Sequence, residues 1–471
     1  MKKIHENFLK PSQQQLNNLI KYYRTGRYID AEKLSLSITQ KFPKHLFAWK
    51  VLAAVLKQNG RINESILISQ KSVQLDPQDA EAHNNLGTLL QQQGKLKEAE
   101  ASYGKAIELK PDFTHAHFNL GNMLKVLGRL KEAEVSYRKA ITFKPNYAEV
   151  YNNLGVLQLQ QGRLKEAEAS YSKAITFKPN YAEAHINLGK ALNIQGKLKE
   201  AEASFRQAIT LEPDLAVAHY NLGKVYKKIS KKSKAIECFE KTLKLSSEDL
   251  LGAALQLATL GKRKIPVKTP EKFMHEFYKK KSKNWDNFEK TNTYRGHLLI
   301  ENAFKKTHIT SKKIDILDMG CGTGSLAKIL RPYARTLVGV DLSPDMLFKA
   351  EEICLYDALY KKDLNQYLSE VLNHYDTIVA AAVLIHFYDL DNIFLLIKES
   401  LKLNGKFIFS IFEETKKKKD LNSFLMYAHS DNYITSLANS LNLKTIYKQK
   451  DIHEYHNGVS VPSIIYVLEK K

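Results

Sequence analysis

Apolar and polar residues follow a helical period across the first half of the chain, and the pattern repeats every 34 residues. Prolines mark this period at Pro43, Pro77, Pro111, Pro145, Pro179 and Pro213. If each unit starts 31 residues before its proline, seven units begin at residues 12, 46, 80, 114, 148, 182 and 216. The seventh unit has Ser247 in place of the proline. A period of this length predicts stacked helical pairs that bury a shared core.

Within the third to sixth units, small and aromatic residues recur at fixed positions. A leucine followed by glycine recurs as Leu86, Leu120, Leu154 and Leu188. The turn between two helices is predicted at Gly94, Gly128, Gly162 and Gly196. Alanines that allow close helix approach are Ala99, Ala133, Ala167 and Ala201. Aromatic rings expected to fill the core between helices are Tyr103, Tyr137, Tyr171 and Phe205. Each unit is therefore predicted to be a helix, a glycine turn, a second helix and a proline stop.

This pattern resembles the tetratricopeptide repeat over about 240 residues, and the first, second and seventh units are degenerate in the way expected of end repeats. In that family the first helix of each unit lines a concave groove. The sixth position of five units holds an asparagine: Asn85, Asn119, Asn153, Asn187 and Asn221. A carboxamide offers a donor and an acceptor together, so it can bind a peptide backbone without reading side chains.

The asparagine column is similar to the one in the repeat arm of O-linked N-acetylglucosamine transferase, which holds extended polypeptide. The resemblance implies a protein or peptide partner in the groove. The alternative is recent duplication, which copies every residue regardless of its role. The fifth position nevertheless diverges between units while the sixth does not, as Asn84, Phe118, Asn152, Ile186 and Tyr220 show.

After the seventh unit the pattern changes to short apolar runs that alternate with helical stretches. Residues 250–261 are expected to form a capping helix, and the two prolines and four basic residues of KRKIPVKTP suit a linker. One helix is expected over 271–302, with aromatic anchors at Phe273, Phe277, Trp285 and Tyr294. Three domains follow from this division: repeats over 12–249, a cap and linker over 250–270, and a second domain over 271–471.

Alternating strands and helices in the second domain predict a doubly wound α/β sheet. Strands are expected at 314–318, 336–341, 358–360, 377–382, 406–412, 444–448 and 463–468. Helices are expected at 325–330, 346–352, 390–402 and 433–440. The last two strands have only a short segment between them, so they are expected to form an antiparallel hairpin at one end of the sheet.

The strongest chemical signal is the run DMGCGTG, which follows the first of these strands. Ligands of such sheets lie beyond the carboxyl ends of the strands, and Gly320, Gly322 and Gly324 allow the backbone to pass close to a ligand. The spacing G-x-G-x-G, with Asp318 two residues earlier, differs from the dinucleotide spacing G-x-G-x-x-G. It resembles the first motif of class I S-adenosylmethionine-dependent methyltransferases.

Three further segments agree with that resemblance. Asp341 ends the second strand, followed by Leu342, and its carboxylate is expected to accept hydrogen bonds from the ribose hydroxyls of S-adenosylmethionine. The resemblance places Asp363 and Leu364 near the adenine, and Ala380 of the fourth strand beside the transferring methyl. The tail YAHSDNYITSLANSLNL and its hairpin are similar to those of bacterial proteins that join tetratricopeptide repeats to a methyltransferase domain.

A base is needed only if the acceptor must lose a proton before methyl transfer, and two histidines are candidates for it. His386 follows the fourth strand and is expected to face the acceptor, and His429 in the tail is the second candidate. No (D/N/S)-P-P-(Y/F) or Pro-Cys follows this strand, which argues against nucleobase or glutamine amino methylation and covalent cytosine chemistry. Related sequences often carry Asp where this chain has Ala382, which bears on acceptor binding or turnover.

Composition and charge do not alter the predicted domains or the predicted site. The net charge of +22 arises mostly in residues 1–264, with 42 Lys and Arg against 25 Asp and Glu, and a lysine-rich solvated surface is the simplest explanation. Three scattered cysteines predict neither a disulfide framework nor a metal site. No apolar run long enough for a membrane span or signal peptide is present, so a cytoplasmic location is expected.

Three hypotheses remain. The first is a methyltransferase whose repeats recruit a protein or peptide acceptor, with nucleic acid not expected. The second is a scaffold with a domain that binds the cofactor but turns over weakly, and the third is a small-molecule methyltransferase that uses its repeats only for assembly.

Overall fold

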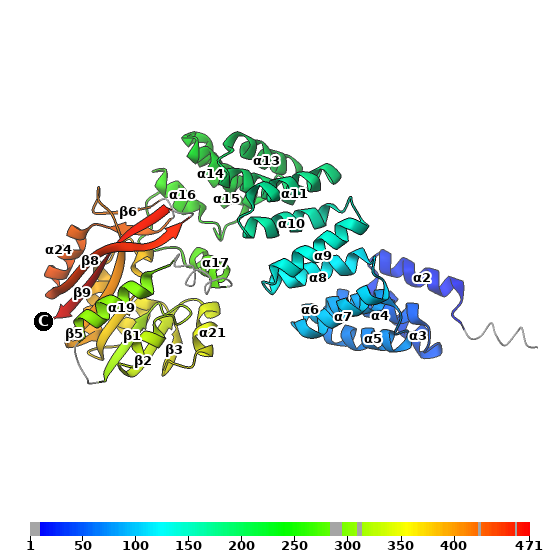
Figure 1. The fold of residues 1–471 in the computed structure, drawn as a ribbon, viewed down its shortest axis with the longest axis horizontal. Coiled ribbons are helices and arrows are strands. Elements are labelled where there is room, and N and C mark those ends of the chain that lie inside the picture. The colour runs from blue at the N-terminus through cyan, green and yellow to red at the C-terminus, as the bar shows by residue number, and fades with distance from the viewer. Residues whose placement is uncertain (1–9, 283–293, 309–312, 423–424, 457–458) are drawn as a thin grey trace, which may run out of the picture. The chain divides into compact units, whose positions relative to one another are not determined.

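The chain divides into two compact units, residues 1–218 and 219–471. The computed structural model describes residues 10–282, 294–308, 313–422, 425–456 and 459–471 (Figure 1). Trp285, one of the expected aromatic anchors, lies outside these residues.

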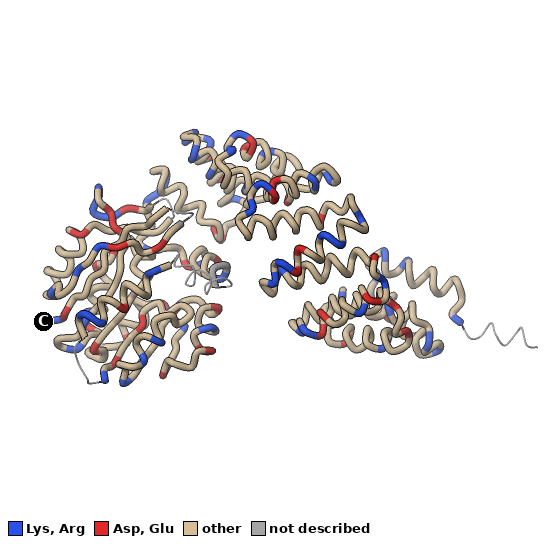
Figure 2. Tube along the Cα trace, viewed as in Figure 1, with Lys and Arg blue, Asp and Glu red and all other residues tan. Residues whose placement is uncertain are grey.

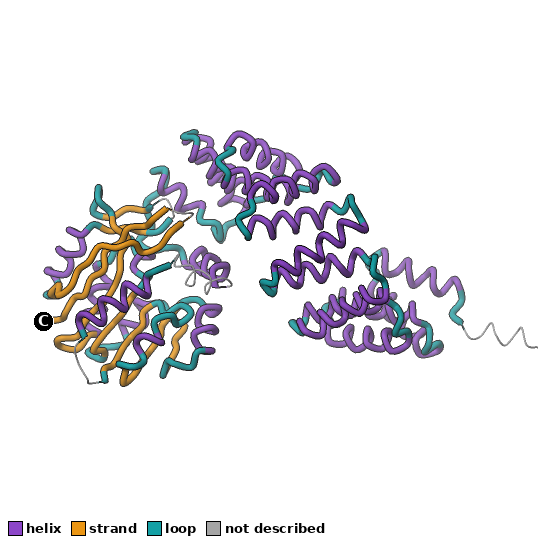
Figure 3. The backbone as a smooth tube through the Cα atoms, viewed as in Figure 1, coloured by secondary structure: helices purple, strands orange, loops and turns teal. Residues whose placement is uncertain are grey.

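The first unit consists of paired helices (Figures 1 and 3). Their bounds are α2 Gln13–Arg24, α3 Tyr28–Lys41, α4 Leu46–Gln58, α5 Ile62–Leu75, α6 Ala80–Gln92, α7 Leu96–Leu109, α8 Thr114–Val126, α9 Leu130–Phe143, α10 Ala148–Gln160, α11 Leu164–Phe177, α12 Ala182–Ile194 and α13 Leu198–Leu211. Two more helices, α14 Ala216–Lys228 and α15 Lys232–Leu245, continue the pattern into the second unit. The predicted repeat solenoid is therefore confirmed.

Aromatic rings on the second helices pack against glycines on the first helices. A Cβ added to Gly121 would lie 2.6 Å from the ring of Tyr137, and one added to Gly87 would lie 2.8 Å from the ring of Tyr103. The rings of Tyr103, Tyr137, Tyr171 and Phe205 are completely buried. Each ring thus needs a glycine opposite it, because the helices are too close for any side chain there.

The second unit is built on one large sheet. Its first strands are β1 Ile314–Met319, β2 Ala334–Asp341, β3 Ala358–Lys361, β4 Tyr375–Ala380 and β5 Leu401–Glu413. They lie in the order β3-β2-β1-β4-β5, and each neighbouring pair is parallel. Two long strands, β8 Leu443–His456 and β9 Val459–Lys470, form an antiparallel hairpin, and β9 pairs antiparallel with β5. The predicted α/β class and the closing hairpin are confirmed.

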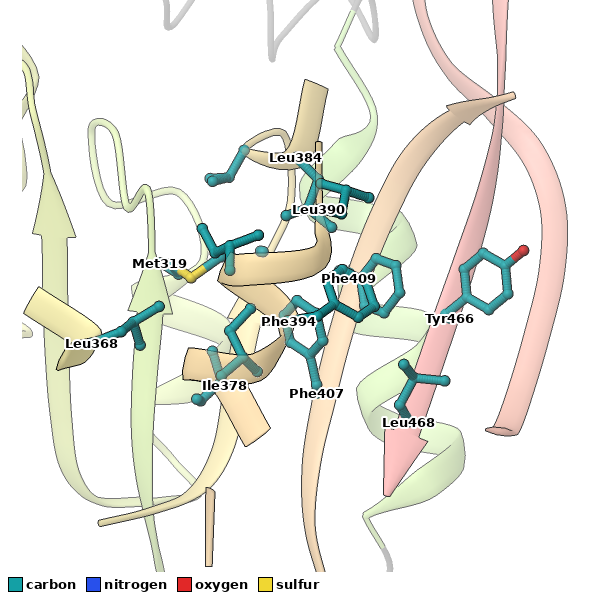
Figure 4. Close-up of a cluster of buried hydrophobic side chains, with 14 of the residues drawn as sticks. Met319, Leu368, Ile378, Leu384, Leu390, Phe394, Phe407, Phe409, Tyr466 and Leu468 are labelled. Atoms are coloured by element: carbon teal, nitrogen blue, oxygen red, sulfur yellow. The ribbon is translucent and has the colours of Figure 1, made fainter. Parts of the chain in front are cut away.

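Helices cover both faces of this sheet, as expected of a doubly wound fold. Their bounds are α19 Gly296–Thr307, α20 Ala327–Leu330, α21 Pro344–Glu352, α22 Leu364–Ser369, α23 Asp391–Ser400 and α24 Asp431–Ser440. Alternate residues of β9 enter two separate cores: Tyr466 and Leu468 pack with Phe407 and Phe409 (Figure 4), while Val467 packs on the face covered by α19. This alternation is the period of two that a strand buried on both faces requires.

Several sequence expectations need correction. The single helix expected over 271–302 is wrong: α17 covers Glu271–Ser282, Tyr294 pairs with Glu454 in a β-bridge, and α19 begins only at Gly296. The closing strands are much longer than expected. Two short strands, β6 Lys419–Leu421 and β7 Tyr427–His429, were not predicted, because three residues are too few to give a period.

The predicted linker is hydrogen-bonded to the α/β domain and does not simply connect it to the repeats. After the capping helix α16 (Ala253–Thr259), the backbone of Val267 accepts hydrogen bonds from the amides of Tyr388 and Asp389 at 2.8 and 3.3 Å. Lys268 forms an antiparallel bridge with Phe387. The Tyr427 hydroxyl donates to the carbonyl of Pro266 at 2.9 Å. We call residues 265–269 the strap, since they lie along the segment that follows β4.

Charge and hydropathy complete the description. Lys and Arg are interspersed with Asp and Glu along the trace of each unit (Figure 2). Among the described residues, no helix is both long and apolar enough to cross a membrane.

Candidate functional site

A cavity opens at the carboxyl ends of β1, β2 and β4, where the glycine loop begins. Gly320 and Gly322 adopt φ values of +70° and +56°, which other residues rarely reach. A Cβ on Gly320 would overlap Val383, whereas one on Gly322 would meet no atom within 4 Å. The loop is thus pressed against the segment after β4 and leaves open space above Gly322.

Asp341 lies at the end of β2 beside this loop. Its carboxylate accepts the amide of Gly322 at 2.9 Å and the amide of Ser343 at 2.8 Å. Burial raises the pKa of Asp341. A carboxylate has about four acceptor positions, so acceptor capacity remains for a hydroxyl of a ligand. Ser343 then caps α21, with Pro344 at the first helical position, as the sequence suggested.

Asp318 lies deeper, under the loop. It is almost fully buried, and its Oδ2 accepts a hydrogen bond of 2.7 Å from the hydroxyl of Tyr356. Burial raises the pKa of Asp318 to about 7. Burial also raises the pKa of the Cys321 thiol well above its usual value, so this cysteine stays a neutral thiol.

Asp363 lies at the rim of the cavity, where it caps α22. Its carboxylate accepts the amide of Asn365 at 3.0 Å and forms an ion pair of 3.0 Å with Lys268. Lys268 belongs to the strap, so the segment that leaves the capping helix contacts the predicted cofactor site directly. No sequence motif indicated this pair, whose members are 95 residues apart.

His386 is held between two hydroxyl groups. Its Nε2 lies 2.7 Å from the hydroxyl of Tyr278, and its Nδ1 lies 3.3 Å from the hydroxyl of Thr269. The backbone carbonyl of His386 also accepts the amide of Thr269 at 2.8 Å. A neutral imidazole has one donor and one acceptor, and hydroxyl groups can satisfy both. Burial raises the pKa of Tyr278, so its phenol is protonated at neutral pH.

The cavity wall beyond the cofactor loop is rich in aromatic and imidazole groups. Met274, His275 and Tyr278 come from α17, and Tyr294 and His297 come from the start of α19 and the residues before it. Tyr294 packs against Met346 and stacks edge-on with the buried His453, whose Nε2 lies 2.9 Å from the carbonyl of Ala381. These groups line the same cavity as Ala381 and Ala382, which directly follow β4.

Most of the predicted site residues line this one cavity: Asp318, Gly320, Gly322, Asp341, Leu342, Asp363, Leu364 and His386. Gly324 instead packs under Ile353 and Tyr356. Ala380 is completely buried within β4. Ala382 does line the cavity, so the departure from Asp falls at the site itself.

His429, the second candidate base, lies elsewhere. It is completely buried, is not part of the cavity lining, and packs against the ring of Tyr433 at 5.8 Å between centroids. Burial lowers the pKa of His429 to about 4. The structure therefore brings only His386 to the predicted cofactor residues. Tyr278 and Thr269, which sequence analysis missed, contact His386 from positions more than 100 residues away.

The asparagine column has a mixed environment. Asn85 is exposed, Asn119 and Asn153 are half-buried, and Asn187 and Asn221 are buried. The amide of Asn119 donates to Asn84 of the preceding unit at 3.0 Å, and the amide of Asn187 donates likewise to Asn152 at 3.0 Å. Asn153 donates to Asn122 at 2.7 Å. These bonds link consecutive units, which is a structural role for the column.

Comparisons with known proteins support both the repeats and the α/β domain predicted from the sequence. A family described as a methyltransferase domain matches residues 291–450. Tetratricopeptide-repeat families match residues 80–113 and 216–249 and three overlapping segments between 121 and 230. The chain thus combines tetratricopeptide repeats with a methyltransferase domain. The fold and the motifs around Asp318 and Asp341 are those of class I methyltransferases.

Individual relatives match only in part. A probable S-adenosylmethionine-dependent methyltransferase of Saccharomyces cerevisiae is 27% identical over 176 residues, which cover 36% of this chain and 58% of that protein. The malonyl-(acyl-carrier protein) O-methyltransferase of Acetivibrio thermocellus is 29% identical over 146 residues, covering 30% and 50%. The chain thus spans about half the length of these curated relatives.

Among solved structures, the repeats match YrrB, described as a TPR protein with an unusual peptide-binding site. The identity is 26%, with a TM-score of 0.35, over 40% of this chain and 97% of that one.

Proposed function

We propose that the protein is an S-adenosylmethionine-dependent methyltransferase that acts on a protein or peptide acceptor recruited by its repeats. The observation that carries the proposal is the convergence of Gly320, Gly322, Asp341 and His386 on one cavity. The cavity fits the cofactor because it has open space above Gly322 and a carboxylate with remaining acceptor positions at Asp341. Bound there, S-adenosylmethionine supplies an electrophilic methyl group.

The residues of the chain would act mainly by positioning. Asp341 would accept hydrogen bonds from the ribose hydroxyls, and the rim formed by Asp363 and Leu364 would hold the adenine. Tyr294 and Tyr278 would cover the acceptor and exclude water. Positioning of two reactants accounts for much of the acceleration in such a displacement.

His386 is the proposed base. In its neutral form it can take a proton from an acceptor hydroxyl or amine, through its own Nε2 or through the hydroxyl of Tyr278 2.7 Å away. An acceptor that is already ionised, such as a carboxylate, would need no base, and His386 would then only orient it. His429 remains a candidate from the sequence alone, and its position outside the cavity lining argues against that role.

Recruitment by the repeats is the second part of the proposal. The hydrogen bonds to Asn84 and Asn122 fix the carboxamides of Asn119 and Asn153, so that their oxygens have a set direction for accepting peptide amides. One matched relative is described as acting on a malonyl group of an acyl-carrier protein, so a protein-borne acceptor has a precedent among related domains.

The alternatives are a scaffold with weak turnover, favoured by Ala382 at the acceptor wall, and a small-molecule enzyme that uses its repeats for assembly. Radiolabelled cofactor added with cell lysate separates them. Label in protein supports the leading proposal, label only in small molecules supports the third hypothesis, and cofactor binding without S-adenosylhomocysteine release supports the scaffold.

Calorimetry with S-adenosylmethionine tests the shared premise. Asp341→Ala should weaken binding by at least about tenfold, since hydrogen bonds to a charged group contribute roughly 1.5–3 kcal/mol. Glu352→Ala, at an exposed site on α21, is the matched control. If neither the wild type nor this control binds the cofactor, every cofactor-based hypothesis for the chain is wrong.

A further inference from the structure

The second repeat lacks the aromatic ring that fills the core of the repeats after it. At the position of Tyr103, Tyr137, Tyr171 and Phe205, the second unit has Ser69. Opposite it stands Ala53, where the third to seventh units have a glycine beneath the ring. Ser65 and Ser72 replace the alanines found at the equivalent positions of the third to sixth units. Three serines thus occupy places that are otherwise filled by a ring and two methyl groups.

The space left by the ring is part of an open hollow of about 480 Å³ that extends along the groove from Tyr23 to Asn119. Its lining includes Ala53, Ala54, Lys57, Ser65, Ser69 and Ser72 on α4 and α5. An apolar cavity of ~150 Å³ is enough for a benzene ring, so the hollow is large enough for an aromatic side chain. The first unit also has serine, Ser35, at the ring position, but Leu19 replaces the glycine there and is completely buried.

A second observation points to a ligand. Ser72 is 2% exposed and lines the hollow, yet its hydroxyl has no hydrogen-bond partner among the described residues. Leaving a buried hydroxyl unsatisfied destabilises the fold by roughly 1–3 kcal/mol, so such a group in a native structure usually meets a partner.

The other repeats indicate how a ring would be received. The hydroxyl of Tyr103 donates to Gln91 at 2.9 Å, and that of Tyr137 donates to Asn122 at 2.8 Å. The equivalent positions in the second unit are Lys57 and Ala54, both in the wall of the hollow. The same wall continues to Asn84 and to Asn85 and Asn119, which are the first two residues of the asparagine column.

We infer that the hollow of the second repeat binds a tyrosine side chain of an extended peptide whose backbone lies along the asparagine column. The ring takes the place that Tyr103 and its equivalents occupy in later repeats, and its hydroxyl meets polar groups of the wall, among them Ser72 and Lys57. This inference rests on the proposed recruitment of a peptide, and it adds the side chain that the repeats select.

A variant that restores the consensus closes the hollow. Ala53→Gly with Ser69→Tyr recreates the glycine and ring of the third unit, and both changes are needed because a Cβ opposite such a ring would lie 2.8 Å from it. The probes are p-cresol and toluene, which reproduce the side chains of tyrosine and phenylalanine. Their binding to the full chain is measured by ligand-observed NMR. The wild type should bind p-cresol more tightly than toluene, and the double variant should bind neither.

Two further variants sharpen the test. Ser69→Leu places an apolar side chain at the ring position and should also abolish p-cresol binding. It keeps the test valid if the double variant fails to fold. Ser72→Ala keeps the hollow but removes its buried hydroxyl, and it should reduce the preference for p-cresol over toluene by about two- to tenfold, the effect of one neutral hydrogen bond. Equal binding of the two probes by the wild type would overturn the tyrosine assignment.

Peptides complete the experiment. A fluorescein-labelled Gly-Ser peptide with one central tyrosine should bind at least about tenfold more tightly than the same peptide with alanine, and the double variant should lose this difference. No binding of p-cresol at millimolar concentration, or unchanged binding by both filled variants, would overturn the site. Cofactor binding and methyl transfer by the methyltransferase domain are measured separately. If the hollow does not bind tyrosine, the proposed activity is therefore unaffected.

Discussion

The hydroxyl of Tyr278 lies 2.7 Å from Nε2 of His386, although the two residues are 108 positions apart in the chain. Tyr278 comes from α17, which precedes the sheet, and His386 comes from the segment after β4. The contact links the helix over the acceptor side of the cavity to the proposed base.

Tyr278→Phe is expected to lower turnover by about tenfold with little change in cofactor affinity. The phenol contributes one hydrogen bond that orients His386, and such a bond accounts for roughly 0.5–1.5 kcal/mol. His386→Gln should lower turnover by about 10²–10⁴-fold if the acceptor must lose a proton. The measurement is release of S-adenosylhomocysteine with the lysate fraction that takes up label, across a range of pH.

Thr269 provides a matched comparison for this prediction. Thr269→Ser keeps the hydroxyl near Nδ1 of His386 and should retain turnover, whereas Thr269→Val keeps the shape and should reduce it. Equal turnover in the two variants would show that the hydroxyl does not position His386.

The buried His429 should make the second unit sensitive to acid. The pKa of His429 is lowered to about 4 in the folded state, against about 6.5 when unfolded, so between these values the unfolded chain binds more protons. The stability tied to this group is fully present above pH 6.5 and is lost as the pH falls toward 4, by up to about 3 kcal/mol. Burial lowers the pKa of His308 to about 4 as well, so it acts in the same window.

His429→Phe should therefore reduce the loss of unfolding temperature between pH 6.5 and 4, leaving the part due to His308 and the opposing part due to the buried carboxyl of Asp318. His374→Phe, at an exposed position, is the control and should leave the wild-type slope. A steep slope that persists unchanged in His429→Phe would argue against this assignment.

Two asparagines of the column should respond differently to removal. Asn187→Ala leaves the buried Oδ1 of Asn152 without its donor and should destabilise the first unit by roughly 1–3 kcal/mol. Asn85→Ala, at an exposed position, should leave stability within about 0.5 kcal/mol and weaken only peptide binding. Chemical denaturation and peptide titration measure the two effects separately. If Asn187→Ala loses stability but neither variant loses peptide binding, the column has a structural role alone.

Two glycines offer a test of the repeat packing. Gly121→Ala places a Cβ 2.6 Å from the ring of Tyr137 and should destabilise the first unit by about 1–3 kcal/mol. Gly104→Ala lies on the exposed side of α7, where a Cβ meets nothing within 4 Å, and should stabilise it by up to about 1 kcal/mol through helix propensity. Thermal unfolding measures both, and a destabilised Gly104→Ala would contradict the packing described.

Periodic features of the fold could be predicted from the sequence, since they are local. The 34-residue period predicted the helical pairs, and DMGCGTG with Asp341 predicted where the sheet has a cavity. The short β6 and β7, and the break in the helix before Gly296, could not be predicted because they depend on pairing with distant strands. Tyr294, for example, is drawn out of a helix by its bridge to Glu454.

Contacts between distant segments were the main gap in predicting the site. Thr269 has no motif around it and was assigned to a linker because of its prolines and lysines. Its role appears only when the strap pairs with the segment after β4. The choice between His386 and His429 was also open, because the sequence does not show what either side chain faces. Both are buried in the folded state, and of the two only His386 lines the cavity.

The strap has a consequence for how the protein can be divided. Lys268 contacts Asp363, and Thr269 contacts His386. Both residues nevertheless precede residue 271, where the sequence predicted the second domain to begin. A fragment that begins at Glu271 would keep every strand but lose both contacts. The smallest piece with the proposed activity should therefore begin upstream of the strap, and any natural exchange of repeat arms between such proteins would have to carry residues 265–269 along with the methyltransferase domain.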